Sequence, residues 1–199
     1  MNGRREQEAF EVLRRTLHAA RSSVVAMGAV LRLLRERTLQ LPGPERERSQ
    51  HEIDLLLRSV DRIDALITRA RPLVPGRQPR RRKMELLPVL ERARQAAGSP
   101  AATLEVPPLL PGLLCDAETL TALLADLIER AGHAGGPVAV RAQVAQRSVR
   151  IDVVGAASPA AVRERALARA LAARLGVQLR LRSGRDGKMV ESVLLLRRP

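Results

Sequence analysis

The sequence contains one cysteine, one phenylalanine and no tryptophan or tyrosine in 199 residues. Because Cys115 is alone, no intramolecular disulfide and no cysteine cluster for a metal ion can form, which fits a reducing, cytoplasmic location. Because Phe10 is the only aromatic residue, the stacking platforms that bind single-stranded nucleic acids are missing. The formal net charge of +14 therefore stands as the only sign of nucleic-acid binding, and we do not expect that partner.

Long apolar runs are also scarce. No run approaches the roughly 20 residues that span a bilayer. The first residues, Met-Asn-Gly-Arg-Arg-Glu-Gln-Glu, lack the apolar core of a signal peptide. We therefore predict a soluble, cytoplasmic protein with no membrane partner.

Two stretches near the N-terminus repeat apolar residues at alternating spacings of three and four. The first comprises Phe10, Leu13, Leu17, Ala20, Val24, Met27, Leu31 and Leu34, and the second comprises Ile53, Leu56, Val60, Ile63, Ile67 and Ala70. This spacing predicts helices with one apolar seam, over 4–41 and 45–71, separated at the prolines of Leu41-Pro-Gly-Pro44. One hairpin cannot hide both seams, so we predict a homodimer in which two hairpins form a four-helix bundle.

A mixed pattern follows a segment rich in proline and arginine. We interpret 72–83, with its basic run Arg80-Arg81-Arg82-Lys83, as a linker, which gives a hairpin domain over 1–83 and a second domain over 84–199. In the second domain the pattern predicts helices over 86–97, 117–131 and 160–175, and strands over 103–106, 112–116, 138–144, 149–154, 177–182 and 189–196. The chain is therefore predicted to be α+β: a hairpin followed by a small α/β sandwich with helices on one face of a mostly antiparallel sheet.

This arrangement resembles the dimerisation and ATP-binding core of bacterial sensor histidine kinases, over nearly the whole chain. The match is strongest at His18-Ala-Ala-Arg-Ser-Ser-Val24, which is similar to the family's phosphoacceptor motif His-Glu-x-Arg-Thr/Asn-Pro-Leu. Further matches are Leu113-Leu-Cys-Asp-Ala-Glu-Thr-Leu120 and Leu171-Ala-Ala-Arg-Leu-Gly-Val-Gln-Leu179. The resemblance implies that His18 accepts a phosphoryl group.

His18 follows the seam residue Leu17 and so falls at a b position of the heptad, outside the predicted core. A neutral imidazole near pH 7 has a free lone pair and is a competent nucleophile toward phosphoryl groups. Arg14 and Arg21 lie about one turn away on either side, where they can stabilise the transferred charge, and the motif adds Ser22 to this candidate catalytic set. The alternative is a solvated histidine among solvated arginines. We expect His51 to face solvent, and for both His51 and His133 we favour no functional role.

The second domain lacks the residues that the resemblance would require for ATP use. Asp126 and Arg130 stand where the kinases have two asparagines, and a guanidinium cannot ligate Mg²⁺. The sequence Val154-Gly-Ala-Ala-Ser-Pro159 lacks the aspartate that grips adenine, and no glycine for a phosphate loop lies between 159 and 175. Asp152 and Glu129 could be imagined as replacements, but we favour a charge on a strand face for Asp152 and a charge on a helix surface for Glu129. We expect no cofactor and no metal ion.

Two hypotheses follow. In the first, the protein is a histidine phosphotransferase that relays phosphoryl groups between response-regulator receiver domains through His18, with the receiver's own Mg²⁺ and without kinase activity. In the second, it is an inactive, kinase-like dimeric adaptor that binds a partner such as a true sensor kinase. Ala19 and Ser23 favour the second hypothesis, because the family has an acidic residue and a proline there.

Overall fold

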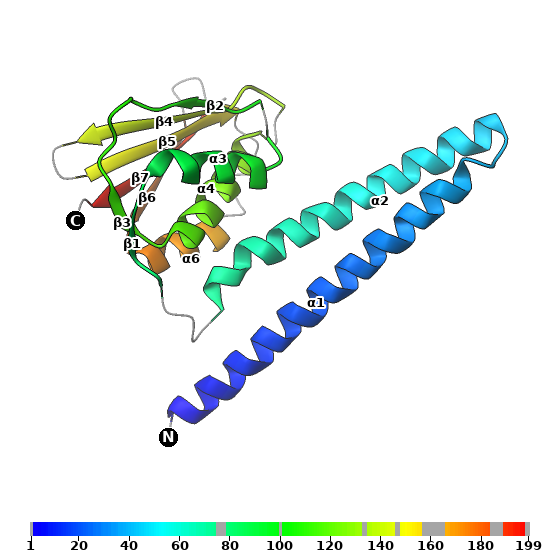
Figure 1. Ribbon diagram of the computed structural model, residues 1–199, viewed down its shortest axis with the longest axis horizontal. Coiled ribbons are helices and arrows are strands. Elements are labelled where there is room, and N and C mark those ends of the chain that lie inside the picture. Colours follow the sequence, from blue (N-terminus) through cyan, green and yellow to red (C-terminus); the bar gives the residue numbers. More distant parts are fainter. Residues whose placement is uncertain are drawn as a thin grey trace. The chain divides into compact units, whose positions relative to one another are not determined.

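The computed structural model describes residues 2–74, 79–99, 101–132, 135–145, 148–156, 166–183 and 189–197. Contacts divide the chain into two compact units, Met1–Gly76 and Arg77–Pro199. Figure 1 shows both units, with the helices and strands labelled in chain order.

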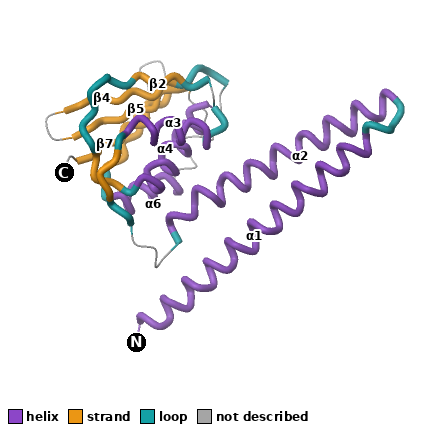
Figure 2. Tube along the Cα trace, viewed as in Figure 1, coloured by secondary structure: helices purple, strands orange, loops and turns teal. Residues whose placement is uncertain are grey.

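The first unit is a helical hairpin. It consists of α1 (Asn2–Thr38) and α2 (Gly43–Ala70), and a 3-10 turn, η1 (Arg71–Leu73), follows α2. Figure 2 shows the two long helices side by side, joined by a short turn. Proline occupies the first turn of α2, where its missing N–H costs no helical hydrogen bond. The predicted helix–turn–helix is confirmed, although α1 ends three residues before the predicted boundary.

The N-terminal helix contains a longer apolar segment than we predict from the sequence. Its segment Arg15–Thr38 is long and apolar enough to cross a membrane, with a mean hydropathy of 1.3 in its best window. The expectation that no stretch reaches this length is therefore wrong, because small alanines and serines separate the few charges. The core helix of a soluble protein meets the same criterion, so this is weak evidence for a membrane span.

The second unit contains seven strands and three helices in its described part. These are β1 (Arg82–Met84), α3 (Leu86–Ala96), β2 (Thr103–Glu105), β3 (Leu113–Cys115), α4 (Ala117–Gly132), β4 (Ala139–Ala145), β5 (Ser148–Ala156), α6 (Ala166–Leu175), β6 (Gln178–Ser183) and β7 (Met189–Arg197). The predicted strands over 103–196 are all present. The start of the predicted helix at 160–165 lies outside the described residues.

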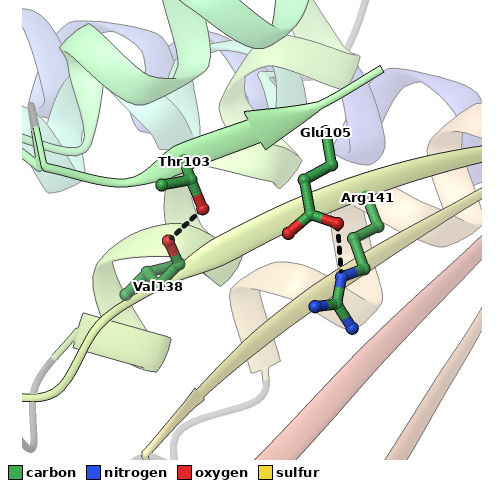
Figure 3. Close-up of polar contacts among 4 residues, drawn as sticks. All are labelled: Thr103, Glu105, Val138 and Arg141. Carbon is green, nitrogen blue, oxygen red and sulfur yellow. Dashed lines mark hydrogen bonds and ion pairs between the residues drawn. The ribbon is translucent and has the colours of Figure 1, made fainter. Parts of the chain in front are cut away.

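The main sheet has five strands in the order β2-β4-β5-β7-β6. The β2–β4 pair is parallel and the other pairs are antiparallel, as the sequence predicted for most of the sheet. Side-chain contacts reinforce the parallel pair: Thr103 Oγ1 donates to the carbonyl of Val138 at 3.3 Å, and Arg141 Nε lies 2.8 Å from Glu105 Oε2 (Figure 3). The helices α3, α4 and α6 cover one face of this sheet (Figure 1).

A second, two-stranded sheet corrects the linker prediction. β1 pairs with β3 in antiparallel register, with Lys83 opposite Leu114. The end of the predicted linker is therefore a strand, and its sequence does not indicate one because three residues, two of them charged, have no apolar alternation. Lys83 instead packs its methylene chain against Gly112, as long cationic side chains do when they cover apolar surface.

The core of the second unit surrounds α4. Seven consecutive residues of this helix, from 122 to 128, are buried. Leucines of α3 and α6 pack on it from the helical layer, and alternate residues of β5 (Val149, Ile151 and Val153) are buried beneath it. The large apolar residues keep a helical spacing (Leu120, Leu123, Leu124, Leu127 and Ile128), and the small Ala122 and Ala125 between them are buried as well, so this part of α4 is enclosed on all sides.

Candidate functional site

The hairpin has two sides of different character. At about 100° per residue, a set of apolar residues lies on one side of the α1–α2 contact, and His18 and the charged residues that join the helices lie on the other. We call the first side the apolar stripe. It consists of Met27, Val30 and Leu34 from α1 and Leu56, Ile63 and Leu66 from α2, and all six are exposed.

The heptad positions divide between the hairpin core and this stripe. Val24, Ile53 and Val60 are buried in the hairpin, whereas Met27 and Ile63 are 47% and 43% exposed. A single hairpin therefore hides only about half of the seam that the spacing defines. The remaining half is free to contact another surface.

His18 lies on the other side of α1 and is exposed. Its position agrees with the b position that the heptad gives it, since the neighbouring Leu17 turns inward and is only partly exposed. The imidazole is therefore accessible to a protein partner. His51, on α2, is also exposed, and His133 lies outside the described residues.

Two serines after His18 bond to the helix backbone. Ser22 Oγ donates to the carbonyl of His18 and Ser23 Oγ to the carbonyl of Ala19, each at 3.1 Å. A proline in place of Ser23 would leave the carbonyl of Ala19 without its amide partner, whereas α1 here runs through this point without a break. The hydroxyl of Ser22 is thus engaged by the backbone, one turn from the imidazole.

Arg21 connects the two helices. Its Nε lies 3.5 Å from Oδ1 of Asp64 on α2, and the two side chains are 49% and 38% exposed. A second pair of the same kind joins Arg35 to Asp54 at 3.4 Å, nearer the turn of the hairpin. The side chain of Arg14 lies outside the described residues, so only His18, Arg21 and Ser22 of the candidate set are placed. Asp64 was missed, because no local spacing connects it to Arg21.

The second unit contains a buried ion pair at the positions compared above with the kinase asparagines. On α4, Arg130 Nη2 lies 2.9 Å from Asp126 Oδ2, and the side chains are 12% and 9% exposed. The Nε of Arg130 also donates to the carbonyl of Asp126 at 3.3 Å. These residues do not fit a divalent cation, because the guanidinium has no lone pair and already neutralises the carboxylate.

The end of β5 is packed against the end of α4. A Cβ on Gly155 would lie 2.5 Å from the carbonyl oxygen of Ala131, so only glycine fits at this point. On the opposite face of β5, Asp152 is buried and accepts from Arg150 Nε at 2.9 Å. This pairing is consistent with the prediction that Asp152 is a charge on the face of a strand and not a ligand.

Asp116 has a structural role that the sequence reading overlooked. Its Oδ1 accepts from the backbone N–H groups of Glu118 and Thr119 at 3.1 and 3.2 Å, which caps α4, and its Oδ2 accepts from the N–H of Arg80 at 2.9 Å. An aspartate just before an apolar helix is a typical N-cap signal. The same carboxylate ties the start of the basic run to α4.

The neighbouring Cys115 is buried. Burial raises the pKa of its thiol from 9.0 to about 11, and the hydrogen bond to the backbone of Asp116 lowers it only in part. A thiol in this state is a poor nucleophile at neutral pH. Among the described residues, no group of three or more histidine, cysteine or acidic side chains could hold a metal ion.

No protein-family model and no curated protein matches the sequence. Solved structures do match in fold. Full-length ShkA in complex with AMPPNP aligns with a TM-score of 0.64 and 18% identity, over 94% of this chain and 45% of that chain. The histidine kinase ThkA, in complex with the response regulator TrrA, aligns with a TM-score of 0.62 and 14% identity, over 99% of this chain and 64% of that one.

The histidine kinase AdeS of Acinetobacter baumannii aligns with a TM-score of 0.53 and 14% identity, over 84% of this chain and 95% of that chain. The present chain thus spans about half the length of ShkA and nearly two thirds of ThkA. At such identities the likeness concerns the fold. It confirms the predicted fold class: a helical hairpin and a small mixed α/β domain with the fold of the histidine kinase dimerisation and ATP-binding domains.

Proposed function

We propose that this protein is a histidine phosphotransferase that relays phosphoryl groups between receiver domains through His18. The observation that carries the proposal is the exposed imidazole of His18 on α1, in a hairpin with the histidine kinase fold. Arg21, one turn further along the same side of the helix, supplies a cation near the place where phosphoryl charge would gather. ThkA, one of the similar structures, is seen in complex with a response regulator.

The chemistry requires only an exchange at phosphorus. A lone pair of a neutral ring nitrogen of His18 attacks the phosphorus of a phosphoaspartate, and the P–O bond to the aspartyl carboxylate breaks. The carboxylate leaves with that electron pair, and the imidazole keeps the proton on its other nitrogen. The reverse sequence passes the group to a second receiver.

ATP has no part in this proposal. The ion pair between Arg130 and Asp126 supports this, because it places a permanent internal cation where the resemblance requires metal ligands. Ala19 adds support, since it lacks the acidic side chain that the resemblance connects with self-phosphorylation. The second unit would then contribute to receiver docking.

The apolar stripe is proposed to mediate homodimerisation. Large exposed apolar residues in this number are uncommon on a monomer surface. Four of them, Met27, Leu34, Leu56 and Ile63, belong to the same heptads whose other positions are buried in the hairpin, and Val30 and Leu66 lie beside them. Pairing two stripes would complete a four-helix bundle and leave the side that carries His18 free for the receiver. The net charge of +14 would accelerate association with an acidic receiver pocket more than it would tighten binding.

The adaptor hypothesis remains the second candidate. It is favoured by Ala19 and by Ser23, which keep α1 continuous where the phosphoacceptor motif has an acidic residue and a proline. In that case the hairpin would pair with a second protein, such as a true sensor kinase, and His18 would carry no phosphoryl group.

Phosphoryl transfer from receiver domains separates the two candidates. The receiver domains encoded in the source genome are charged with acetyl phosphate, and each is incubated with the purified protein. We expect at least one to deliver phosphate that is labile in acid and stable in base, as phosphohistidine is. The variant His18→Gln should take up none, whereas His51→Gln, which removes another exposed histidine, should behave as wild type.

Uptake by His18→Gln would contradict the proposal directly, since the phosphoryl group would then lie elsewhere. Uptake from no receiver in the set would favour the adaptor. A calorimetric titration with ATP and Mg²⁺ completes the test: micromolar binding by the wild-type protein would restore the kinase interpretation.

A further inference from the structure

The ion pair between Arg21 and Asp64 contains an unusual carboxylate. Oδ1 of Asp64 is covered from solvent, yet within the described residues it accepts no hydrogen bond. The Nε of Arg21 lies 3.5 Å away, too far for a good hydrogen bond and close enough for an ion pair. The guanidinium is therefore held mainly by charge, and it is half exposed.

We propose that Asp64 is a positioning residue for phosphoryl transfer: it holds the Arg21 guanidinium beside His18 in the resting protein and releases it to the incoming phosphoryl group. This inference rests on the proposed function. A phosphoryl group has about two negative charges and three acceptor oxygens, and an arginine fork binds such a group in a bidentate manner. A single loosely held carboxylate is a weaker competitor, so Arg21 would change partner when phosphate arrives.

The geometry of the helix allows this exchange. Arg21 is three residues after His18, so the two side chains are neighbours on one side of α1. Because the arginine side chain is about half exposed, its guanidinium can turn from Asp64 toward His18 without leaving a buried position. Without Asp64 the long side chain would sample many rotamers, and each transfer would have to restrict them again.

The hairpin itself offers a matched control. Arg35 and Asp54 form the second ion pair between α1 and α2, with a separation of 3.4 Å and side chains 56% and 39% exposed. Arg35 lies about 26 Å from His18 along the helix axis, at ~1.5 Å per residue. Removing either carboxylate should cost the same small amount of stability. Only Asp64 can affect the chemistry at His18.

The test charges the protein with phosphoramidate, a small phosphoryl donor, so that no receiver is needed. Wild type is compared with Arg21→Ala, Asp64→Asn, Asp64→Glu, Asp54→Asn and the double variant Arg21→Ala/Asp64→Asn. We expect the rate of phosphohistidine formation to fall about tenfold in Arg21→Ala and severalfold in Asp64→Asn. Asp64→Glu should recover part of the rate, and Asp54→Asn should equal wild type.

Two further results decide the assignment. The double variant should be no slower than Arg21→Ala, because Asp64 acts only through that arginine. Melting temperatures of Asp64→Asn and Asp54→Asn should agree, which removes stability as the cause. Equal charging rates in Asp64→Asn and wild type, or equal losses in Asp64→Asn and Asp54→Asn, would overturn the inference. Because phosphoramidate replaces the receiver, failure of receiver transfer would refute the relay without deciding the role of Asp64.

Discussion

The hairpin and the second unit differ in how far their apolar side chains are buried. In the second unit, α4 is buried for seven consecutive residues, and leucines such as Leu120, Leu123 and Leu124 have no exposed surface. In the described parts of α1 and α2, Val24, Ile53 and Val60 are the only buried large aliphatic residues. The described part of the second unit thus has a core of its own, whereas about half of the hairpin's apolar seam is exposed.

Two kinds of ion pair can also be compared. The hairpin's pairs, Arg21–Asp64 and Arg35–Asp54, are about half exposed and join two helices. The pair Arg130–Asp126 in the second unit is buried on a single helix. Half-exposed pairs can change partner at little cost, while a buried pair is fixed. The Arg21–Asp64 pair can therefore rearrange more easily than Arg130–Asp126, although the second unit also has a half-exposed pair, Arg141–Glu105.

The largest effect should come from a charge in the apolar stripe. In the proposed dimer, Leu34→Asp would bury one carboxylate from each chain in the interface, at a cost of several kcal/mol. We expect the dimer to dissociate at micromolar concentration, with the solution mass falling to the 21.8 kDa of one chain. Sedimentation equilibrium measures this change.

The adjacent Leu33 provides the control. It is 59% exposed, more than Leu34 at 43%, but it points away from the stripe. Leu33→Asp should therefore remain dimeric. A wild-type protein that sediments as a monomer, or equal behaviour of the two variants, would contradict the assignment of the stripe.

A smaller but still large effect is expected at the buried ion pair. Arg130→Ala leaves the carboxylate of Asp126 buried without its cation, which should lower the free energy of unfolding by about 3–5 kcal/mol. Asp54→Asn in the hairpin removes a half-exposed pair and should cost less than about 1 kcal/mol. Urea denaturation of both variants measures the difference. The double variant Arg130→Met/Asp126→Leu should recover most of the loss, since apolar residues can replace a buried pair; no recovery would show that the pair has another role.

The close contact of β5 with α4 should give an intermediate effect. Gly155→Ala would place a Cβ 2.5 Å from the carbonyl oxygen of Ala131, so the helix end must shift, at a cost of about 1–3 kcal/mol. Gly43→Ala at the start of α2 meets nothing within 4 Å and should leave stability unchanged or slightly improved. Thermal unfolding of both variants tests the comparison. Equal melting temperatures would show that the end of α4 can shift at little cost in stability.

Much of the fold could be predicted from sequence because its signals are local. Heptad spacing placed both long helices, and the alternation of apolar residues placed β4 and β5 to within two residues. The b position also predicted an exposed His18. Strand β1 was missed because a three-residue strand composed of Arg82, Lys83 and Met84 has no apolar pattern.

The parts of the site that sequence could not provide are long-range contacts. Asp64 lies 43 residues from Arg21 along the chain, and Arg80 lies 36 residues from Asp116. Only the fold of the hairpin or of the second unit brings each pair together. By contrast, Asp126 and Arg130 are four residues apart on one helix, and this spacing alone is enough to predict that the two side chains pair.

The smallest effect concerns the thiol of Cys115 in the second unit. Burial raises its pKa from 9.0 to about 11, so folding favours the protonated thiol. The resulting stability is fully present below pH 9 and is lost as the pH rises toward 11. Because lysine side chains also titrate near this range, the informative quantity is the difference between wild type and Cys115→Ala in urea denaturation at pH 8 and pH 10.5. We expect wild type to lose more stability than the variant over this interval. Equal losses of stability in wild type and variant would show that the thiol is as well solvated in the folded protein as in the unfolded chain. The core of the second unit would then be less well buried at Cys115 than the comparison with the hairpin requires.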